Sequence, residues 1–211
     1  MDTAERLFAD QTFHGVSLRE ITQAASVNLA SVNYHFRNKE SLFREVFLRR
    51  VRPLNALRLS LLDEARAQAG TRPPPLEKII EALARPLFDL HRSTDTGGRY
   101  FVQILSRGIS EPLQITKQLL AEEYHPVLTK FGQLIRRHAP QLSPAEFLWR
   151  LSFVVGAMHH TLATFQQMPF LTRGICRSDD HESALAHFIT HSVATFLAPP
   201  TLAFGLSPSH P

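Results

Sequence analysis

Short polar side chains that donate and accept hydrogen bonds are concentrated between residues 28 and 36. The outward face of this segment carries Asn28, Ala30, Ser31, Asn33, Tyr34 and His35. Small, amide and hydroxyl side chains let a helix lie in a major groove about 12 Å wide and bond base edges or phosphate oxygens. Taken singly, each of these residues would equally suit an ordinary solvated helix face. The segment as a whole therefore predicts a nucleic-acid-reading surface only if neighbouring elements hold it as a helix.

Start and stop signals supply those elements. Ser17 and Glu20 have the spacing of a capping box, in which each side chain bonds the backbone amide of the other. A tight break at residues 24–27 follows, and Asn28 can cap the next helix. That helix turns one apolar face inward, made of Leu29, Val32 and Phe36. The pattern predicts a helix-turn-helix.

Most of the positive charge near the amino end lies just after the predicted helix-turn-helix and not within it. Residues 37–52 hold two acids, Glu40 and Glu45, against six basic residues: Arg37, Lys39, Arg44, Arg49, Arg50 and Arg52. The net charge of the whole chain is +4, with a pI near 9.6. We expect Lys39 and the first-turn amides beside it to face a phosphate, and affinity for DNA to fall modestly with salt.

Two stretches resemble the opening of TetR-family transcriptional regulators. They are residues 4–21 (AERLFADQTFHGVSLREI) and 27–36 (VNLASVNYHF), the second followed by NKESL at 38–42. The resemblance implies an all-helical homodimer with an amino-terminal DNA-binding head and a carboxy-terminal effector and dimerisation body. It implies that the DNA-facing residues are Ser17, Arg19, Asn28, Ala30, Ser31, Asn33, Tyr34, His35 and Lys39.

The chain departs from the family pattern in two places. It begins inside the first helix, where the family usually has a further turn. Ser26 stands where the family typically has glycine, and a positive φ there would cost roughly 1 kcal/mol.

Helical periodicity extends over nearly the whole chain, and strand signals are absent. We expect an all-α fold of about nine helices, at 2–12, 17–24, 28–35, 39–68, 76–93, 99–109, 113–138, 143–168 and 181–197. The expected divisions are a DNA-binding head at 1–47, an effector and dimerisation body at 48–198, and a flexible tail at 199–211. The long fourth helix would join head to body, with Leu54, Leu57 and Leu61 facing inward.

The body offers a dimer seam and a ligand cavity. The helices at 143–168 and 181–197 are apolar enough to pair with a second copy. The residues expected around an effector cavity are Phe88, Gln103, Arg107, Tyr124, Trp149, Phe153 and His160. Residues 100–106, 119–126 and 139–156 loosely resemble the branch of the family that senses fatty-acid-like or other lipophilic signals. An aromatic stripe at helical spacing also fits plain core.

Several classes of protein are excluded on sequence grounds. The single cysteine, Cys176, rules out an intrachain disulfide and a cysteine-cluster zinc site, and His187 with His191 supplies only two metal ligands, so we expect no metal and no cofactor. No acid–base set, phosphate loop or nucleophile motif indicates an enzyme. No membrane span or signal peptide is present, which favours the cytoplasm.

The sequence thus predicts a dimeric regulator of palindromic double-stranded DNA, a repressor released by a small apolar or amphipathic effector. The alternative is a helical adaptor that binds protein and recognises no DNA.

Overall fold

The computed structural model describes residues 1–93, 97–110 and 113–201, and within these ranges all regular structure is helical. The all-α prediction is confirmed. Of the expected tail at 199–211, residues 202–211 lie outside the described part. No helix of the described chain is long and apolar enough to cross a membrane.

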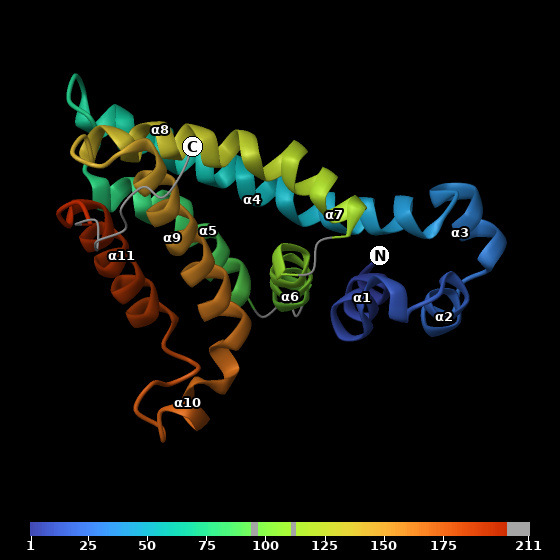
Figure 1. The fold of residues 1–211 in the computed structure, drawn as a ribbon. Helices are drawn as coiled ribbons and strands as arrows, with labels where there is room; N and C mark the ends of the chain where they lie inside the picture. Colours follow the sequence, from blue (N-terminus) through green and yellow to red (C-terminus); the bar gives the residue numbers. More distant parts are fainter. Residues whose placement is uncertain (94–96, 111–112, 202–211) are drawn as a thin grey trace, which may run out of the picture.

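The first three helices are short and lie together at one end of the molecule (Figure 1). They are α1 (Asp2–Gly15), α2 (Leu18–Ala24) and α3 (Leu29–Phe36). The backbone of α1 breaks at Thr12, where φ is 72° and ψ is 170°. A β-branched residue is strained in that region, so the regular part of α1 ends close to the predicted residue 12.

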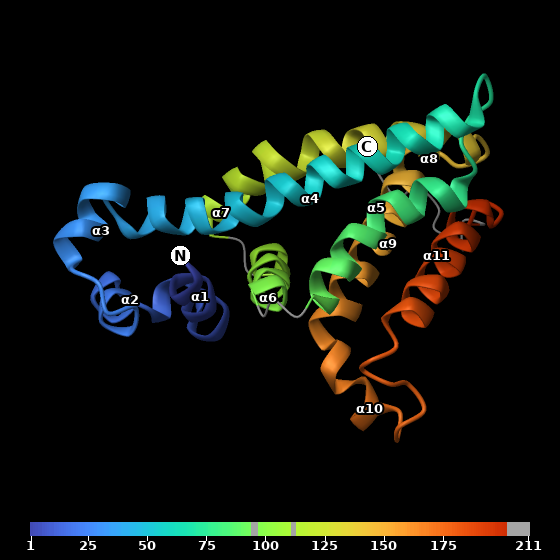
Figure 2. The same cartoon turned by 180° about the vertical axis from the view of Figure 1, so that it is seen from behind.

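The fourth helix, α4 (Lys39–Ala69), starts beside α3 and runs the length of the molecule. It continues through Pro53 without interruption. The rod formed by α7 (Gln114–Leu119), a π-helical turn at Leu120–Tyr124 and α8 (His125–His138) runs back beside it (Figure 2). This pair of long rods connects the two ends of the protein.

The far end of α4 packs against α5 (Leu76–Arg92), and α9 (Pro144–Thr164) and α11 (His181–Leu197) pack against α5 in turn. A 3-10 turn, Phe165–Gln167, leads from α9 into α10 (Met168–Leu171). The helix α6 (Gly97–Ser110) lies between α1 and this group, seen end-on in both views. Counting α7 with α8 and α9 with α10 as single rods, the described chain has the nine helices predicted.

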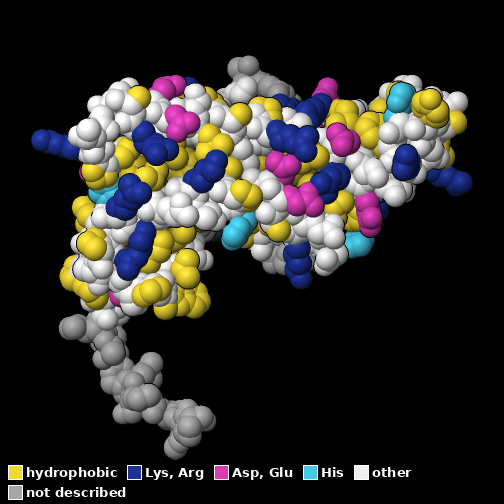
Figure 3. Space-filling model, turned by 90° about the horizontal axis from the view of Figure 1, so that it is seen from above, with side chains coloured by type: hydrophobic (Ala, Val, Ile, Leu, Met, Phe, Trp, Pro, Cys, Tyr) yellow, Lys and Arg dark blue, Asp and Glu magenta, His cyan; other side chains and the backbone are white. Residues whose placement is uncertain are grey.

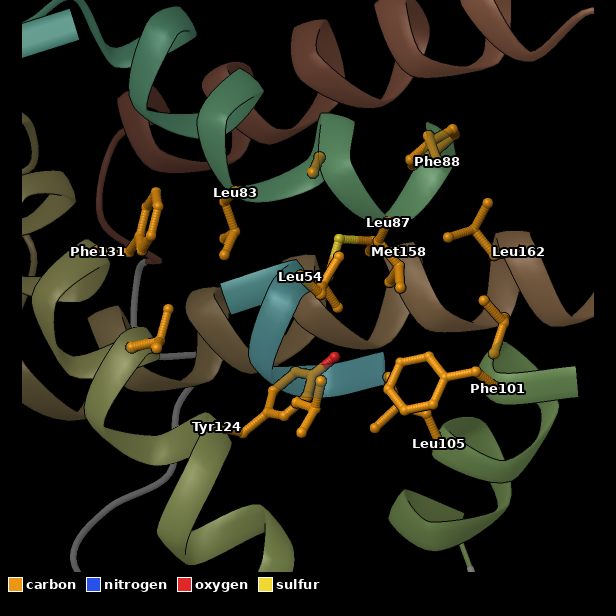
Figure 4. Close-up of a cluster of buried hydrophobic side chains, with 14 of the residues drawn as sticks. Leu54, Leu83, Leu87, Phe88, Phe101, Leu105, Tyr124, Phe131, Met158 and Leu162 are labelled. Carbon is orange, nitrogen blue, oxygen red and sulfur yellow. The ribbon is translucent and has the colours of Figure 1, made fainter. Parts of the chain in front are cut away.

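One apolar core extends from the short helices into the body. Phe8 and Phe43 meet edge-on in the head, with ring centroids 5.1 Å apart. Phe47 and Phe101 continue the core at the junction between α4 and α6. The widest part, shown in Figure 4, brings together leucine, phenylalanine and methionine side chains from α4, α5, α6, α8 and α9. The core therefore couples the two ends mechanically through packed side chains.

Candidate nucleic-acid interface

The capping box predicted at Ser17 and Glu20 is present. Ser17 Oγ accepts from the Glu20 amide at 3.2 Å, and Glu20 Oε2 accepts from the Ser17 amide at 2.6 Å. These bonds with Ser17 hold the pKa of the Glu20 carboxyl below its usual range, so it is ionised at neutral pH. The start of α2 is thus fixed by these two side chains, and the role of Ser17 in the structure is to position that helix.

The turn between α2 and α3 has the backbone that the family pattern suggested. Ser26 adopts φ 53°, the left-handed region where a side chain costs roughly 1 kcal/mol. Its amide donates to the Gln23 carbonyl at 3.1 Å, and the Val27 amide donates to the Thr22 carbonyl at 3.0 Å. The turn is closed by hydrogen bonds, and α3 emerges from it with Asn28 as its cap.

Only one side of α3 packs against the protein. Val32 and Phe36 rest on the apolar core, and no residue of α3 is fully buried. Positions advance by 100° along a helix, so Ala30 and Tyr34 lie on the opposite side, one turn apart. Tyr34 is 84% exposed. Such a projecting phenol on a shallowly packed helix is suited to contact with a macromolecule.

The remaining predicted residues of α3 flank this ridge. Asn33 is exposed on one flank and His35 on the other, where the His35 ring contacts the Tyr34 ring at 5.3 Å. Ser31 and His35 also border a cavity of about 210 Å³ beside α1 and α4. Asn28 Oδ1 accepts from the Ala30 amide at 2.8 Å and so caps the helix. Arg19 is exposed on α2.

The Lys39 side chain makes contacts within the protein that the sequence did not predict. Its Nζ donates to the carbonyls of Phe13 and Val16, at 2.9 and 3.0 Å, and lies 4.4 Å from the centre of the Phe13 ring. The end of α1 leaves these carbonyls without helical partners, and the ammonium satisfies both. In this structure the Lys39 ammonium therefore holds α1 against α4, and its contact with a phosphate stays a prediction.

The basic residues of α4 are also occupied within the molecule. Arg44 pairs with Glu122 on the π turn, and Arg52 pairs with Glu123 at 3.2 Å. Arg49 and Arg50 both pair with Glu5 on α1. In Figure 3, Lys and Arg side chains are scattered over the face in view, with acidic side chains between several of them. These arginines join α4 to α1 and to the π turn, and the face in view carries no continuous basic patch.

Two family models match the chain. Residues 1–46 match the family model of bacterial regulatory proteins of the tetR family, and residues 81–195 match that of the tetracyclin repressor-like C-terminal domain. The chain belongs to the TetR family. It is a transcriptional regulator with a DNA-binding amino-terminal domain, from a family whose members are generally transcription factors and not enzymes.

Solved structures have the same fold at low sequence identity, and the TetR family transcriptional regulator PfmR is among them. PfmR from Thermus thermophilus superposes with a TM-score of 0.63 at 16% identity, over 91% of this chain and 92% of that one. GusR of Salmonella enterica gives 0.57 at 16% identity, over 93% and 92%. SmeT in its triclosan complex gives 0.57 at 17% identity, over 90% and 88%. No curated protein sequence matches the chain significantly.

The seven residues expected around an effector cavity of this TetR-family regulator are not brought together. Phe88 and Tyr124 are buried in the core, whereas Gln103 is exposed on α6. Trp149 and Phe153 stack on each other on the outer face of α9, 65% and 61% exposed, and His160 is exposed on the same helix. The sequence placed these three residues of α9 inward because an all-round apolar helix does not reveal which side is covered.

Arg107 has a different place again. Its Nη1 donates to the Ala9 carbonyl on α1, beside a cavity of about 100 Å³ lined by Phe8, Phe43 and Ile104. Arg107 thus ties α6 of the body to α1 of the DNA-binding head. The residue stands at the junction of the two parts and outside the central core.

A larger cavity, of about 510 Å³, lies between α9, α10 and α11. Its walls include Phe165, Met168, Ile175, His187 and Phe188, and none of the seven predicted residues. His187 and His191 both border it, yet within the described ranges no three His, Cys, Asp or Glu side chains are grouped to hold a metal ion.

Proposed function

We propose that this TetR-family regulator binds a palindromic operator as a homodimer and is a repressor that a small apolar or amphipathic effector releases. The observation that carries the proposal is the exposed ridge of α3, where Ala30 and Tyr34 project from a helix that the protein covers on one side only. A helix held in this way can enter a major groove without unfolding any part of its own domain.

The DNA-facing set of this proposal comprises Arg19, Asn28, Ala30, Ser31, Asn33, Tyr34 and His35, with Ser17 holding the start of α2. Asn33 is the candidate reader of a base edge, since an amide bonds two atoms of adenine at once. Tyr34 and Arg19 suit phosphate oxygens. Lys39 contributes by fixing the angle between α1 and α4.

A homodimer through α9 and α11 supplies the second DNA-binding head. Leu148, Trp149 and Phe153 are exposed along one side of α9, and Leu197 is exposed at the end of α11. A contiguous apolar face on a monomer marks an interaction site. A second copy packed there gives two heads related by a two-fold axis, which is the symmetry of a palindrome.

The division of labour follows the two ends of the molecule. We place DNA binding in residues 1–47, and effector binding and dimerisation in residues 48–198. An effector of small, apolar character fits the apolar interior of the body, and the triclosan complex of SmeT shows such a molecule bound to a structural relative. A regulator of this kind acts where the chromosome is, so we place it in the cytoplasm.

A shift assay on an operator fragment tests the interface. Asn33→Ala should weaken binding by about 1–3 kcal/mol and relax base preference at one position of each half-site. Tyr34→Ala should weaken binding to all sequences alike. Gln166→Ala, an exposed change on the 3-10 turn far from α3, is the matched control and should bind as the wild type does.

The alternative, a protein-binding adaptor, predicts that the wild type itself shifts no DNA, so that the same two substitutions change nothing in this assay. DNA binding that neither Asn33→Ala nor Tyr34→Ala alters would contradict the proposed placement of α3 in the groove.

A further inference from the structure

A positive charge is buried in the middle of the body without a carboxylate partner. Arg58 on α4 is 0% exposed, and none of the ion pairs among the described residues includes it. Its Nε donates to the Leu83 carbonyl at 2.9 Å and its Nη1 to Asn55 Oδ1 at 3.3 Å, whereas Nη2 has no partner in the described part of the chain. Burying a charge in this way is costly unless something else repays it.

Two further polar groups beside Arg58 are equally unsatisfied. The Tyr124 ring centre is 5.3 Å from the guanidinium carbon, and the Tyr124 hydroxyl, which points into the apolar cluster of Figure 4, lies beside Arg58 but makes no hydrogen bond of normal geometry with any described residue. The His159 ring is 6.2 Å from the Tyr124 ring, and neither of its nitrogens is bonded within the described chain. Native interiors rarely leave several buried polar atoms unpaired in one place.

The protonation states at neutral pH follow from burial. Burial, with the Arg58 charge adding to it, lowers the pKa of His159 to about 4, so its ring is neutral and offers one N–H donor and one acceptor. Burial raises the pKa of the Tyr124 phenol by more than the neighbouring Arg58 guanidinium lowers it, so the hydroxyl keeps its proton. The cluster therefore presents one fixed positive charge and two neutral donors.

Local structure departs from regularity at the same place. Tyr124 ends the π-helical turn Leu120–Tyr124, and the carbonyl of Glu123 in that turn accepts from Asn55 Nδ2 at 2.7 Å. Single π turns inside α-helices occur often at functional sites. On α4, Arg58 occupies an inward position while Leu57 next to it is half exposed, the reverse of what hydropathy favours. Such local conflicts mark positions kept for a purpose other than stability.

We propose that Arg58, Tyr124 and His159 form the binding site for the carboxylate of an organic monoacid with an apolar body, the effector of this regulator. The inference rests on the proposed ligand response and names its chemical class. A guanidinium matches a carboxylate with two parallel hydrogen bonds, and the phenol and imidazole add donors to the same anion. Leu54, Leu83 and Met158 lie in the apolar cluster into which Tyr124 points, and suit a hydrocarbon portion.

The charge and the walls of the site select the ligand. One cation neutralises a monoanion, whereas a di- or triphosphate would remain undercompensated in an apolar interior. A neutral alcohol of the same skeleton would leave the Arg58 charge unpaired. All three side chains are buried, so the acid reaches them only when the helices around them part. The π turn contacts α4 and directly follows α7, which also contacts α6. Because α6 packs against α1, parting at this point displaces elements that reach the DNA-binding head.

The ligand class is tested with the full chain in the absence of DNA. Titration calorimetry is run with short- and medium-chain monocarboxylates, straight-chain and aromatic, each beside the alcohol of the same skeleton. We expect at least one acid to bind about tenfold or more tightly than its alcohol, because a charge-assisted pair is formed only with the acid. If no acid is preferred over its alcohol, the inference is overturned.

Variants then assign the binding to these residues. Arg58→Met keeps an unbranched apolar stem and removes a charge that has no carboxylate partner among the described residues, so its thermal midpoint should not fall while the preference for the acid drops about tenfold. Tyr124→Phe removes a single oxygen that makes no hydrogen bond of normal geometry with any described residue, and should also weaken acid binding. Arg52→Met, on the same helix with its side chain largely exposed, is the control and should bind as the wild type does. Acid binding unchanged in Arg58→Met, or in Tyr124→Phe should the first variant not fold, overturns the inference.

The outcome is separable from the proposed function. An acid that binds through Arg58 without releasing DNA would confirm the site and contradict the proposed ligand response. Release of DNA by another ligand, equally in wild type and Arg58→Met, would support the response and overturn the site.

Discussion

The Arg50 guanidinium holds the Glu5 carboxylate at two points, with Nε 2.9 Å from Oε1 and Nη2 2.9 Å from Oε2. Arg49 Nη2 adds a third hydrogen bond to Glu5 Oε2 at 2.6 Å. Glu5 is 0% exposed, so the carboxylate is removed from water and depends on these donors. The arrangement fixes α1 of the DNA-binding head to α4, the helix that continues into the body.

Glu5→Gln should lower the free energy of unfolding by about 2–3 kcal/mol, because two arginines lose a buried partner. Urea denaturation of the purified protein measures this. Asp10→Asn is the control on the same helix: its pair with Arg6 is 3.6 Å long and half exposed, and is worth less than about 1 kcal/mol. Equal losses in the two variants would show that the ion pair does not join head to body.

Local signals in the sequence were sufficient for the helices and for the helix-turn-helix. The capping box at Ser17 and Glu20, the break before Asn28 and the inward face of α3 involve residues a few positions apart, and all appear in the structure. The positive φ of Ser26 could be expected from its place in the turn. These features are set by short-range hydrogen bonds and side-chain spacing.

Contacts between distant segments could not be predicted in the same way. The partners of Lys39 are carbonyls more than 20 positions earlier, and nothing in the local pattern indicates that α1 ends beneath it. Along α4 the expected inward residues included Leu57, but packing against α5 and the π turn rotates Arg58 inward instead. A charged residue at an inward position of an apolar stripe was the available signal for Arg58.

The histidine pair on α9 illustrates how far helical periodicity alone can predict burial. Adjacent residues differ by about 100°, so only one of His159 and His160 can face the interior. The structure buries His159, whereas the sequence pattern placed His160 at the effector cavity. Helical periodicity shows that the two histidines cannot both face the interior. Which of them does so is decided by tertiary packing.

The salt dependence of DNA binding should distinguish arginines that contact phosphate from arginines that are held in ion pairs within the protein. Arg19→Gln should reduce the slope of log K against log salt by about one, as expected for one lost phosphate contact. Arg44→Gln should leave the slope unchanged, since Arg44 is paired with Glu122. Anisotropy titrations at several salt concentrations measure both. A lower slope for Arg44→Gln would show that the α4 cations reach DNA.

Phe153→Asp should prevent the proposed homodimer from forming and leave a monomer, because it places a charge within the apolar face of α9. Light scattering after size-exclusion chromatography gives the mass. Leu57→Asp is the control, an aspartate at another exposed leucine on α4, and should leave the dimer intact. A Phe153→Asp protein of dimer mass would exclude this face as the interface.

Stability should fall as the pH drops from about 6.5 towards 4. Burial lowers the pKa of His159 to about 4 from the ordinary 6.5. Between these two pH values the histidine is protonated in the unfolded chain and neutral in the folded chain. Each such histidine costs about 1.4 kcal/mol per pH unit, or about 3 kcal/mol over the whole window, and nothing above pH 6.5. His91, whose burial also lowers its pKa to about 4, adds a second contribution.

His159→Met should remove one of these contributions, so that urea midpoints fall less between pH 6.5 and 4 than in the wild type. His160→Met is the neighbouring control, exposed on the same helix, and should titrate like the wild type. An unaltered pH profile in His159→Met would show that this side chain is not buried in its neutral form.

Selection of duplexes from a random DNA pool tests the central claim most directly, run in parallel with the wild type and the double variant Asn33→Ala/Tyr34→Ala. The wild type should enrich a palindrome whose half-sites are centred about one helical turn, or a multiple of it, apart. The double variant, folded by circular dichroism, should lose that enrichment. A wild type that enriches no sequence, or a double variant that enriches the same palindrome equally well, would contradict the account.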